Sequence, residues 1–350
     1  MGMRDLNVSL ILEQLNSLSD AEKHEIIAIL NRSLIGQELS EDFNREELTD
    51  KRFSHDRKCP HCVSANIVKN GNHNGRQRFL CKDCHKTFGE TTNTVLHSTK
   101  KDIGQWVKFA WCMVRGFSLR RCHDEVEISA RTAFFWRHKI LFAISKILKT
   151  DKVDGVVETD ETYFLESVKG KRGIDWLKIG RTARKRGGSA EKRGISDEQV
   201  CVICSLDRIE NILSEATGKS RPKKTDIERF FYGRLVTNSV LCTDEHSSYK
   251  AFAKSQGIQI KQIPSGKHKL GIYHIQHVNS YHSHLKGWMK RFNGVATKYL
   301  NNYLSWFKWL TLRKGLRERD NSQKIIATSY MVDYTIRWED FRLITEAFLN

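Results

Sequence analysis

The chain has 350 residues, and its 59 lysines and arginines outnumber its 41 aspartates and glutamates, giving a formal charge of +18. This length favours two or three folded units, and an apolar share of 39% excludes a largely disordered chain. The 3 prolines exclude a proline-rich protein, and no apolar run approaches the ~18 residues of a membrane-spanning helix. The positive charge predicts a polyanionic partner, and nucleic acid is the first candidate.

The first 50 residues are predicted to form an N-terminal helical segment. Apolar residues recur at helical spacing over 5–35, and Ser19 or Asp20 is a suitable cap for a second helix. The opening, MGMRDLNVSL, lacks a basic region followed by a continuous apolar stretch. We therefore expect a cytoplasmic, nucleoid-associated protein with no membrane attachment.

Four of the nine cysteines form a pattern within residues 56–90. Cys59 and Cys62 form one C-x-x-C pair, and Cys81 and Cys84 form a second pair 18 residues later. Two such pairs can present four thiolates tetrahedrally to one zinc ion. The segment between them, VKNGNHNGRQRFL, alternates and turns like a β-hairpin. The sequence thus predicts a zinc ribbon, with four buried or redox-active cysteines as the alternative.

The other five cysteines are interpreted as structural. Cys201 and Cys204 also read C-x-x-C, but residues three apart on a strand point to opposite faces. Cys112, Cys122 and Cys242 are typical of small apolar core residues. An odd count without a signal peptide favours a reducing compartment over a disulfide framework.

Residues 100–150 are predicted to form three helices. The first ends at Gly116, the second runs from Ser118 to about Val126, and the third begins at Arg131. This order, with a basic final helix, resembles a helix-turn-helix DNA reader, while an ordinary three-helix packing unit is the alternative. The predicted DNA contacts are Arg131, Arg137 and Lys139.

From residue 152 the pattern changes to apolar strands alternating with helices. The segments VDGVVETD, EQVCVICSLD and ENILSEATG read as three strands, of which the third returns antiparallel. Two further strands, SVLCTD and IQIKQI, are separated by a helix, and long helices follow at about 280–314. The pattern predicts an α/β domain over residues 152–315. Residues 316–350 form a tail without a recognisable motif.

A basic segment over residues 169–193 interrupts this domain. Its repeated lysines, arginines and glycines favour a mobile insertion that tracks DNA phosphates, with a solvated loop as the alternative. The predicted contacts are Arg184, Lys185 and Arg186.

Two aspartates, Asp160 and Asp244, each end an apolar strand. Taken singly, such residues are more often strand-end residues or helix caps. Buried together they would repel one another unless a divalent cation neutralised them. Metal ions held in this way can activate a water or a 3′-hydroxyl for phosphoryl transfer. Strand alternation places Glu158 on the face of Asp160 and Glu161 on the opposite face.

Several ordered motifs resemble one known family, the IS1595-type (ISXO2-like) insertion-sequence transposases. The resemblance spans about residues 56–314. It rests on the cysteine ribbon with FSLRRCHDEVEISARTAFFWRHKI, and on VVETDETYF, GRTARKRGGSAEKRG, LCTDEHSSY, HVNSYHSHLK and GVATKYLNNYLSWF. It implies a multidomain α/β protein with a ribonuclease-H-like catalytic domain and a DDE-type Mg²⁺ or Mn²⁺ centre.

Carried over residue by residue, the resemblance implies Asp160 and Asp244 as the first two metal ligands. The third position departs from the family's H-x-N-x-x-E pattern, because histidine, His282, stands where glutamate is expected. We expect His282 as the third ligand and Asn279 as its alternative. Lys286, one turn later, is expected to contact a DNA phosphate.

A separate histidine zinc site is a weaker interpretation, because histidines on helices are most often structural. The histidines concerned are His268, His274, His277, His282 and His284.

Taken together, the sequence predicts a transposase that binds terminal inverted repeats and target DNA as a homodimer or larger assembly. The alternative is a non-catalytic DNA-binding protein derived from a transposase.

Overall fold

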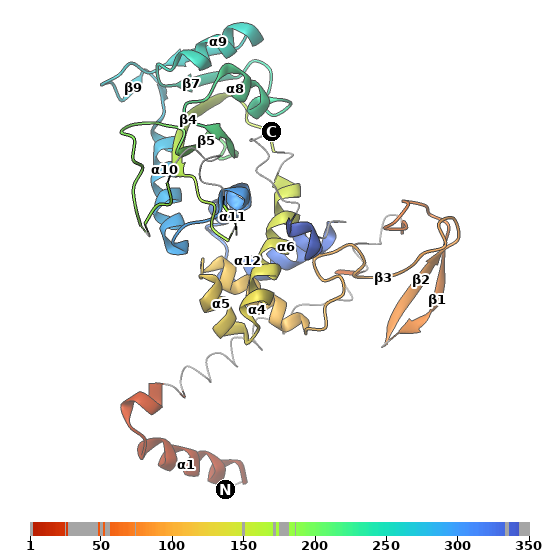
Figure 1. Cartoon of the computed structure of the whole chain (residues 1–350). Helices are drawn as coiled ribbons and strands as arrows, with labels where there is room; N and C mark the ends of the chain where they lie inside the picture. The colour runs from red at the N-terminus through yellow and green to blue at the C-terminus, as the bar shows by residue number, and fades with distance from the viewer. Residues whose placement is uncertain are drawn as a thin grey trace.

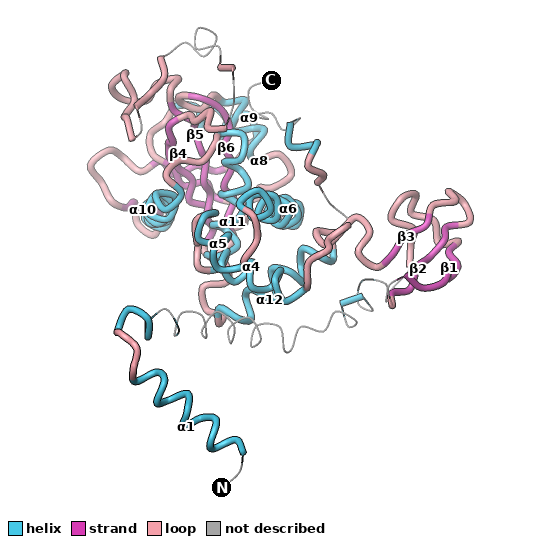
Figure 2. Tube along the Cα trace, turned by 60° about the horizontal axis from the view of Figure 1, so that its bottom comes forward, coloured by secondary structure: helices cyan, strands magenta, loops and turns pink. Residues whose placement is uncertain are grey.

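The computed structural model describes residues 3–24, 26, 48–49, 52, 57–73, 75–148, 151–170, 173–174, 182–185, 187–332 and 336–342. Figures 1 and 2 show a main body, a small cysteine-bearing sheet beside it, and helix α1 (Met3–Asn16) set apart from both. Among the described residues, no helix is both long and apolar enough to cross a lipid bilayer.

A second helical segment follows α1 over residues 20–24. The backbone N–H and hydroxyl of Ser19 donate to Glu22 Oε2 at 2.9 and 2.6 Å, and the Glu22 N–H donates back to Ser19 Oγ. This reciprocal capping box starts the helix. The predicted cap at Ser19 is confirmed, while most of the predicted helix beyond residue 26 lies outside the described residues.

The cysteine segment forms an antiparallel sheet in the order β1–β2–β3 (Ile67–His73, Arg76–Cys81 and Thr87–Gly89). Its small core consists of Phe79 and Phe88, with ring centroids 5.6 Å apart, and the buried Cys59 and Cys81. The predicted hairpin between the cysteine pairs is therefore confirmed.

The three predicted helices are present as α4 (Ile103–Val114), α5 (Leu119–Val126) and α6 (Ala130–Leu148). Asp102 and Ser118 cap α4 and α5 by accepting backbone N–H bonds. The turn between them needs Gly116, which has φ +66° and would place a Cβ 2.9 Å from Arg291 Nη1.

Most of helix α6 is buried, which corrects two of its three predicted DNA contacts. Arg137 is fully buried, and its Nη2 donates to the Phe117 carbonyl at 2.7 Å. Lys139 is also buried and donates to the His97 carbonyl at 3.3 Å. Neither cation can reach a phosphate, because α6 packs against helices of the main body. Of the three predicted contacts, Arg131 alone is exposed.

The main body contains a five-stranded sheet in the order β6–β5–β4–β7–β8. Strands β4, β5 and β6 are antiparallel neighbours, and β7 and β8 run parallel to β4. The strands are β4 (Val156–Leu165), β5 (Gln199–Asp207), β6 (Ile212–Lys219), β7 (Val240–Thr243) and β8 (Gln259–Gln262).

Helices cover both faces of this sheet (Figure 1). One face packs against α8 (Lys224–Phe231) and α9 (Ser247–Gln256), and the other against α10 (Gln276–Met289) and α11 (Leu300–Thr311). Cys201 and Cys204 lie in these two separate cores, so their prediction as strand side chains on opposite faces is confirmed.

Helix α12 (Glu318–Met331), for which the sequence showed no motif, completes the helical layer. It packs against α4 and α6. Trp111 Nε1 donates to Glu318 Oε2 at 3.2 Å, and Trp309 Nε1 donates to Asn321 Oδ1 at 2.9 Å. The first part of the predicted tail therefore belongs to the folded body.

Candidate active site

Strand β4 sends carboxylates to both faces of the sheet. Glu158 and Asp160 point towards α10, where each meets a histidine of that helix. Glu161 points the other way and lies near the buried Tyr249 of α9. Burial, with a smaller contribution from the charges of Asp160 and Asp244, raises the pKa of Glu161 to about 7.

Asp244 is brought beside Asp160 by strand register. Glu158 of β4 pairs in parallel with Cys242 of β7, and each aspartate follows two residues later. Asp244 Oδ1 accepts the His246 N–H at 3.1 Å, which fixes its carboxylate in the turn before α9. The two aspartates thus lie at the same level of neighbouring strands. Asp244 directly follows β7 as predicted, but the prediction that Asp160 ends its strand was wrong, because β4 continues to Leu165.

The histidine found at the expected glutamate position faces the first aspartate. His282 Nδ1 lies 3.7 Å from Asp160 Oδ2, and His282 Nε2 is buried with no hydrogen-bond partner. Burial and the nearby Lys286 lower the pKa of His282 to about 4. The imidazole is therefore neutral at pH 7 and keeps a lone pair, as a metal ligand requires.

The electrostatics of Asp160 favour a bound cation. Burial raises its pKa to about 6, and the negative charge of Asp244 adds to the effect, while Lys286 opposes it. A divalent cation between two such carboxylates would offset the burial and the repulsion. The residues present therefore fit a divalent metal ion chemically.

The distances do not gather the predicted ligands around one point. Among the described residues, two groups bring three or more histidine, cysteine or carboxylate ligand atoms within 4.8 Å of one another. Asp160, Asp244 and His282 are not one of them. Asn279 and Lys286 are exposed on α10, and Lys286 is near enough to affect the pKa values of both Asp160 and His282.

The N-terminus of α10 is anchored to β4 by Glu158, which is 1% exposed. Glu158 Oε2 accepts the backbone N–H groups of His277 at 2.8 Å and Val278 at 3.3 Å. A carboxylate is well placed there because the first N–H groups of a helix lack intrahelical partners. Asp160 follows Glu158 along β4, and His282, which follows His277 along α10, faces it. The anchor at Glu158 therefore holds α10 opposite Asp160.

Arg208, at the end of β5, completes the anchor. Its Nη1 lies 2.8 Å from Glu158 Oε1, 3.0 Å from His274 Nε2 and 2.9 Å from His277 Nδ1. Glu158, His274 and His277 form the second group with metal-like spacing. The guanidinium already supplies the cation there, which argues against the histidine zinc site.

Glu158 and Arg208 are the residues whose roles sequence reasoning missed. The alternation of β4 did place Glu158 on the face of Asp160. Nothing in the sequence indicated that the end of a different strand, β5, would bring Arg208 to it.

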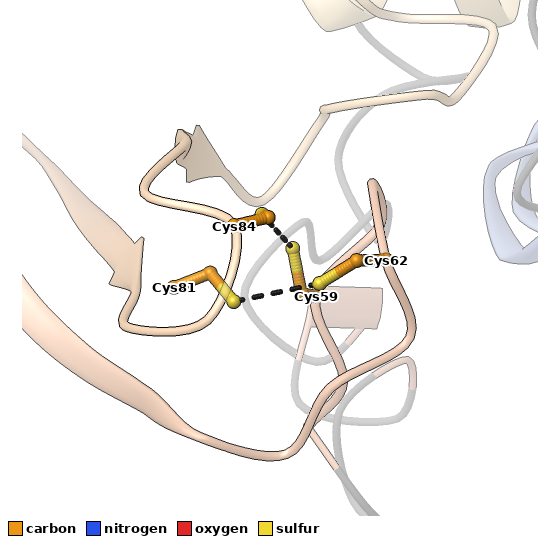
Figure 3. Close-up of side chains that lie close together, drawn as sticks. All are labelled: Cys59, Cys62, Cys81 and Cys84. Atoms are coloured by element: carbon orange, nitrogen blue, oxygen red, sulfur yellow. Dashed lines mark hydrogen bonds between the residues drawn. The ribbon is translucent and has the colours of Figure 1, made fainter.

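The four cysteines of the ribbon converge on one point (Figure 3). The sulfurs of Cys59 and Cys84 are 3.6 Å apart, as are those of Cys62 and Cys81. Four sulfurs bound tetrahedrally to zinc at ~2.3 Å stand ~3.8 Å apart. Backbone N–H groups of Cys84 and Asp83 lower the pKa of Cys81 to about 6, which favours the thiolate. The cluster is compatible with a zinc ribbon.

The described part of the basic segment corrects one predicted DNA contact. Arg184 forms a largely buried ion pair with Glu198 at 2.7 Å and donates to the Glu166 carbonyl at 2.8 Å. It therefore fastens the segment to the sheet rather than facing a phosphate. Lys185 is exposed, and Arg186 lies outside the described residues.

Carboxylates on neighbouring strands beside a helix-borne ligand are an arrangement used by enzymes of metal-assisted phosphoryl transfer. Residues 152–311 match the family model described as the ISXO2-like transposase domain. A relative from Halobacterium salinarum, described as an uncharacterized protein in transposable element ISH50, is 24% identical over 258 residues. That match covers 71% of this chain and 83% of the relative. The chain therefore carries an ISXO2-like transposase domain, as its motifs indicated, and the findings support a transposase.

Proposed function

We propose that this protein binds the terminal inverted repeats of an insertion sequence, cleaves the DNA there and joins the ends to target DNA. The observation that carries the proposal is the register of β4 and β7, which sets Asp160 beside Asp244, together with His282 of α10 facing Asp160 at 3.7 Å. The order β6–β5–β4–β7–β8, with three antiparallel strands followed by two parallel ones, supports the ribonuclease-H-like domain that the family resemblance implies.

Asp160 and Asp244 would hold Mg²⁺ or Mn²⁺, and the neutral imidazole of His282 would complete the ligand set, with the exposed Asn279 as its alternative. The metal would supply Lewis-acid activation of the phosphodiester and its nucleophile. Lys286 stands one helical turn from His282, where its ammonium would bind a non-bridging phosphate oxygen. Glu158 and Arg208 would hold α10 in position.

In this proposal each domain has a separate role in DNA binding or catalysis. The zinc ribbon at 56–90 would recognise the ends, and the domain at 152–315 would carry the chemistry, with the helices of 100–150 as structural support between them. Because two DNA ends must be held together, the acting form would be a homodimer or larger assembly. The N-terminal segment, 1–50, has no assigned role.

A non-catalytic DNA-binding derivative is the second candidate. It is favoured by the histidine at the acidic position and by the spread of the three ligands, which are not gathered within the reach of one ion. In that case Asp160 and Asp244 would serve the fold alone.

The test uses purified protein, duplexes carrying the element's ends and a supercoiled target, with Mg²⁺ or Mn²⁺. Cleavage and joining should occur with the native chain and vanish in Asp160→Asn and Asp244→Asn. His282→Gln should lose at least tenfold in rate. Asp197→Asn, at an exposed carboxylate, is the matched control. End binding without cleavage in either metal would favour the second candidate.

A further inference from the structure

The stretch between Glu245 and Glu318 has an unusual charge pattern. It contains thirteen lysines and arginines and no aspartate or glutamate. It includes β8, a hairpin of β9 (Lys269–Leu270) and β10 (Tyr273–His274), and helices α10 and α11. The whole region that follows the second aspartate of the site therefore complements a polyanion.

The exposed face of α10 extends this pattern away from the active site. Lys286 stands at the edge beside His282, and His284 and Arg291 stand at the opposite edge by helical periodicity. Between these edges the exposed residues are small, polar or cationic: Asn279, Ser280, Ser283, Gly287 and Lys290. A DNA backbone can thus approach the helix closely.

A pocket of about 790 Å³ opens at the far edge of this face, between α10, the β5–β6 turn and the end of α11. Its floor is aromatic, with the ring centroid of Phe307 5.1 Å from that of Tyr281 and 5.4 Å from that of Trp288. Arg208, Arg291 and Lys314 line its rim.

Two acids also line the pocket, and both have partners. The carboxylate of Asp207 accepts the backbone N–H groups of Ile209 and Asn211 at 3.0 and 2.9 Å, so it serves the β5–β6 turn. Glu210 lies 3.8 Å from Lys314 Nζ, and both side chains are highly exposed. A mostly apolar pocket with a cationic rim suits a base joined to a phosphate.

Gly287 lines this pocket from the middle of α10. Its φ is not positive, and a Cβ there would meet no atom within 4 Å. Glycine is destabilising inside a helix, so neither the backbone nor the packing of this chain accounts for it. The absence of a side chain keeps the pocket open.

The tip of the β9–β10 hairpin stands beside the same pocket. Ile272 is 72% exposed, and its carbonyl accepts a bond of 3.2 Å from Arg208 Nη2 at the pocket rim. Arg208 also binds Glu158, which ties the hairpin to the anchor of the candidate active site. Exposed apolar side chains beside a phosphate-binding surface are the groups that proteins insert between base pairs.

We propose that this pocket receives one nucleotide extruded from the DNA near the cleaved phosphodiester, and that Ile272 enters the base stack beside it. The base would stack on the aromatic floor, and its phosphate would meet Arg291 and Lys314. This inference rests on the proposed function, because it needs the DNA end to lie at Asp160 and Asp244.

The test places 2-aminopurine at single positions around the cleavage site of an end duplex, with Ca²⁺ in place of Mg²⁺ so that binding is observed without cleavage. The native protein should raise the fluorescence several-fold at one or two adjacent positions. Gly287→Leu fills the pocket with a good helix former, so it should keep the melting temperature and lose most of the rise. Ile272→Ser should lose a large part of it. Ala251→Leu, on the exposed face of α9, is the matched control.

A bound duplex with no fluorescence rise, or a rise that Gly287→Leu and Ile272→Ser both leave intact, would overturn the proposal. So would a pocket that holds a second copy of the chain, in which case Gly287→Leu would change the oligomeric state and leave the fluorescence as it was. Base extrusion without cleavage in Mg²⁺ or Mn²⁺ would instead refute the proposed cleavage, and of this inference it would support only the binding of an extruded base in the pocket. A failure to bind the ends at all would overturn both.

Discussion

At the scale of single residues, some buried polar side chains stabilise the fold, and others are candidates for metal binding or catalysis. His138 belongs to the first group. Its ring packs at a tilt against the rings of Tyr299 and Phe134, with centroids 4.1 and 4.5 Å away. Burial, with Arg137 and Lys298 nearby, lowers its pKa to about 3 from an ordinary value of 6.5.

This shift predicts a pH dependence of stability. Between the two pKa values the unfolded chain binds a proton that the folded chain refuses, so the free energy of unfolding should fall as the pH drops from about 6.5 towards 3. His138→Phe, which keeps the ring, should flatten that decline. The decline in stability is measured as the difference between the melting temperatures at about pH 7.5 and about pH 4.5, for the native protein and for the variant. An equal decline in native protein and variant would contradict the assignment.

Glu158 connects the residue scale to the site, because its carboxylate holds the first turn of α10. Glu158→Gln keeps one acceptor but removes the charge facing Arg208 and the helix N-terminus. We expect a destabilisation of ~2–4 kcal/mol and a lower rate of cleavage, measured by chemical denaturation and by end cleavage. Glu228→Gln, at a partly exposed carboxylate paired with Lys224, should cost less than ~1 kcal/mol. Equal losses in the two variants would refute the anchor.

At the scale of elements, the sequence predicted most helices and strands because their periodicity is local. The apolar runs before Asp160 and Asp244 lie in β4 and β7, although β4 continues past Asp160 to Leu165, and the spacing of the cysteines matches the four-cysteine cluster. The role of α6 could not be read in this way. Arg137 looks like a DNA contact in sequence, but its guanidinium lies over the Trp306 ring at 4.9 Å, and Trp306 lies far along the chain on α11. Basic residues on a helix indicate a partner only when tertiary packing leaves them exposed.

The candidate site likewise has parts that local sequence patterns predict and parts that depend on long-range contacts. The aspartates that follow apolar runs and the histidine motif are local patterns, so the sequence could name them. The anchor of Glu158 and Arg208 depends on β4, β5 and α10 meeting in space, and α12 docks through single contacts such as Trp309 with Asn321. Such long-range contacts leave no periodic signal in one sequence.

The burial of Arg137 gives a test at this scale. Arg137→Ala removes a buried donor to the Phe117 carbonyl and leaves a cavity, so it should destabilise the protein by ~2–4 kcal/mol. The salt dependence of its DNA binding, measured at a temperature where it stays folded, should match that of the native protein. A shallower salt dependence at unchanged stability would restore the DNA-contact interpretation.

The ribbon permits a separate test by metal removal. Its core of Phe79 and Phe88 is small, so chelation of zinc should unfold the ribbon while the main body keeps its sheet and helices. Amide hydrogen exchange should rise over residues 57–89 and stay low over β4 and β5. The release of one zinc ion per chain and a large loss of end binding should accompany it. Protection that stays unchanged after the zinc has left would show that the sheet needs no metal.

At the scale of the whole molecule, the excess charge of +18 is unevenly distributed along the chain. None of the 41 aspartates and glutamates lies between His246 and Arg317. This region includes the exposed face of α10 and one side of the pocket beside it. One cation of this stretch, Lys286 of α10, is near enough to Asp160 to affect its pKa. This distribution favours a DNA path over α10 rather than a uniform, non-specific attraction.

The salt dependence of binding measures this path. Each phosphate contact contributes about −0.9 to the slope of log K against log salt concentration, so replacing Lys286, Lys290 and Lys314 by glutamine should reduce the slope by about 2.7. The triple variant of Lys100, Lys146 and Lys223 removes the same charge from exposed positions outside the acid-free stretch, and it should change the slope by well under half as much. Equal changes in the two variants would mean that DNA responds to the net charge alone, and the path over α10 would be refuted. A loss confined to the first variant would place the phosphates along the helix that carries His282 and at the pocket beside it, which Lys314 lines.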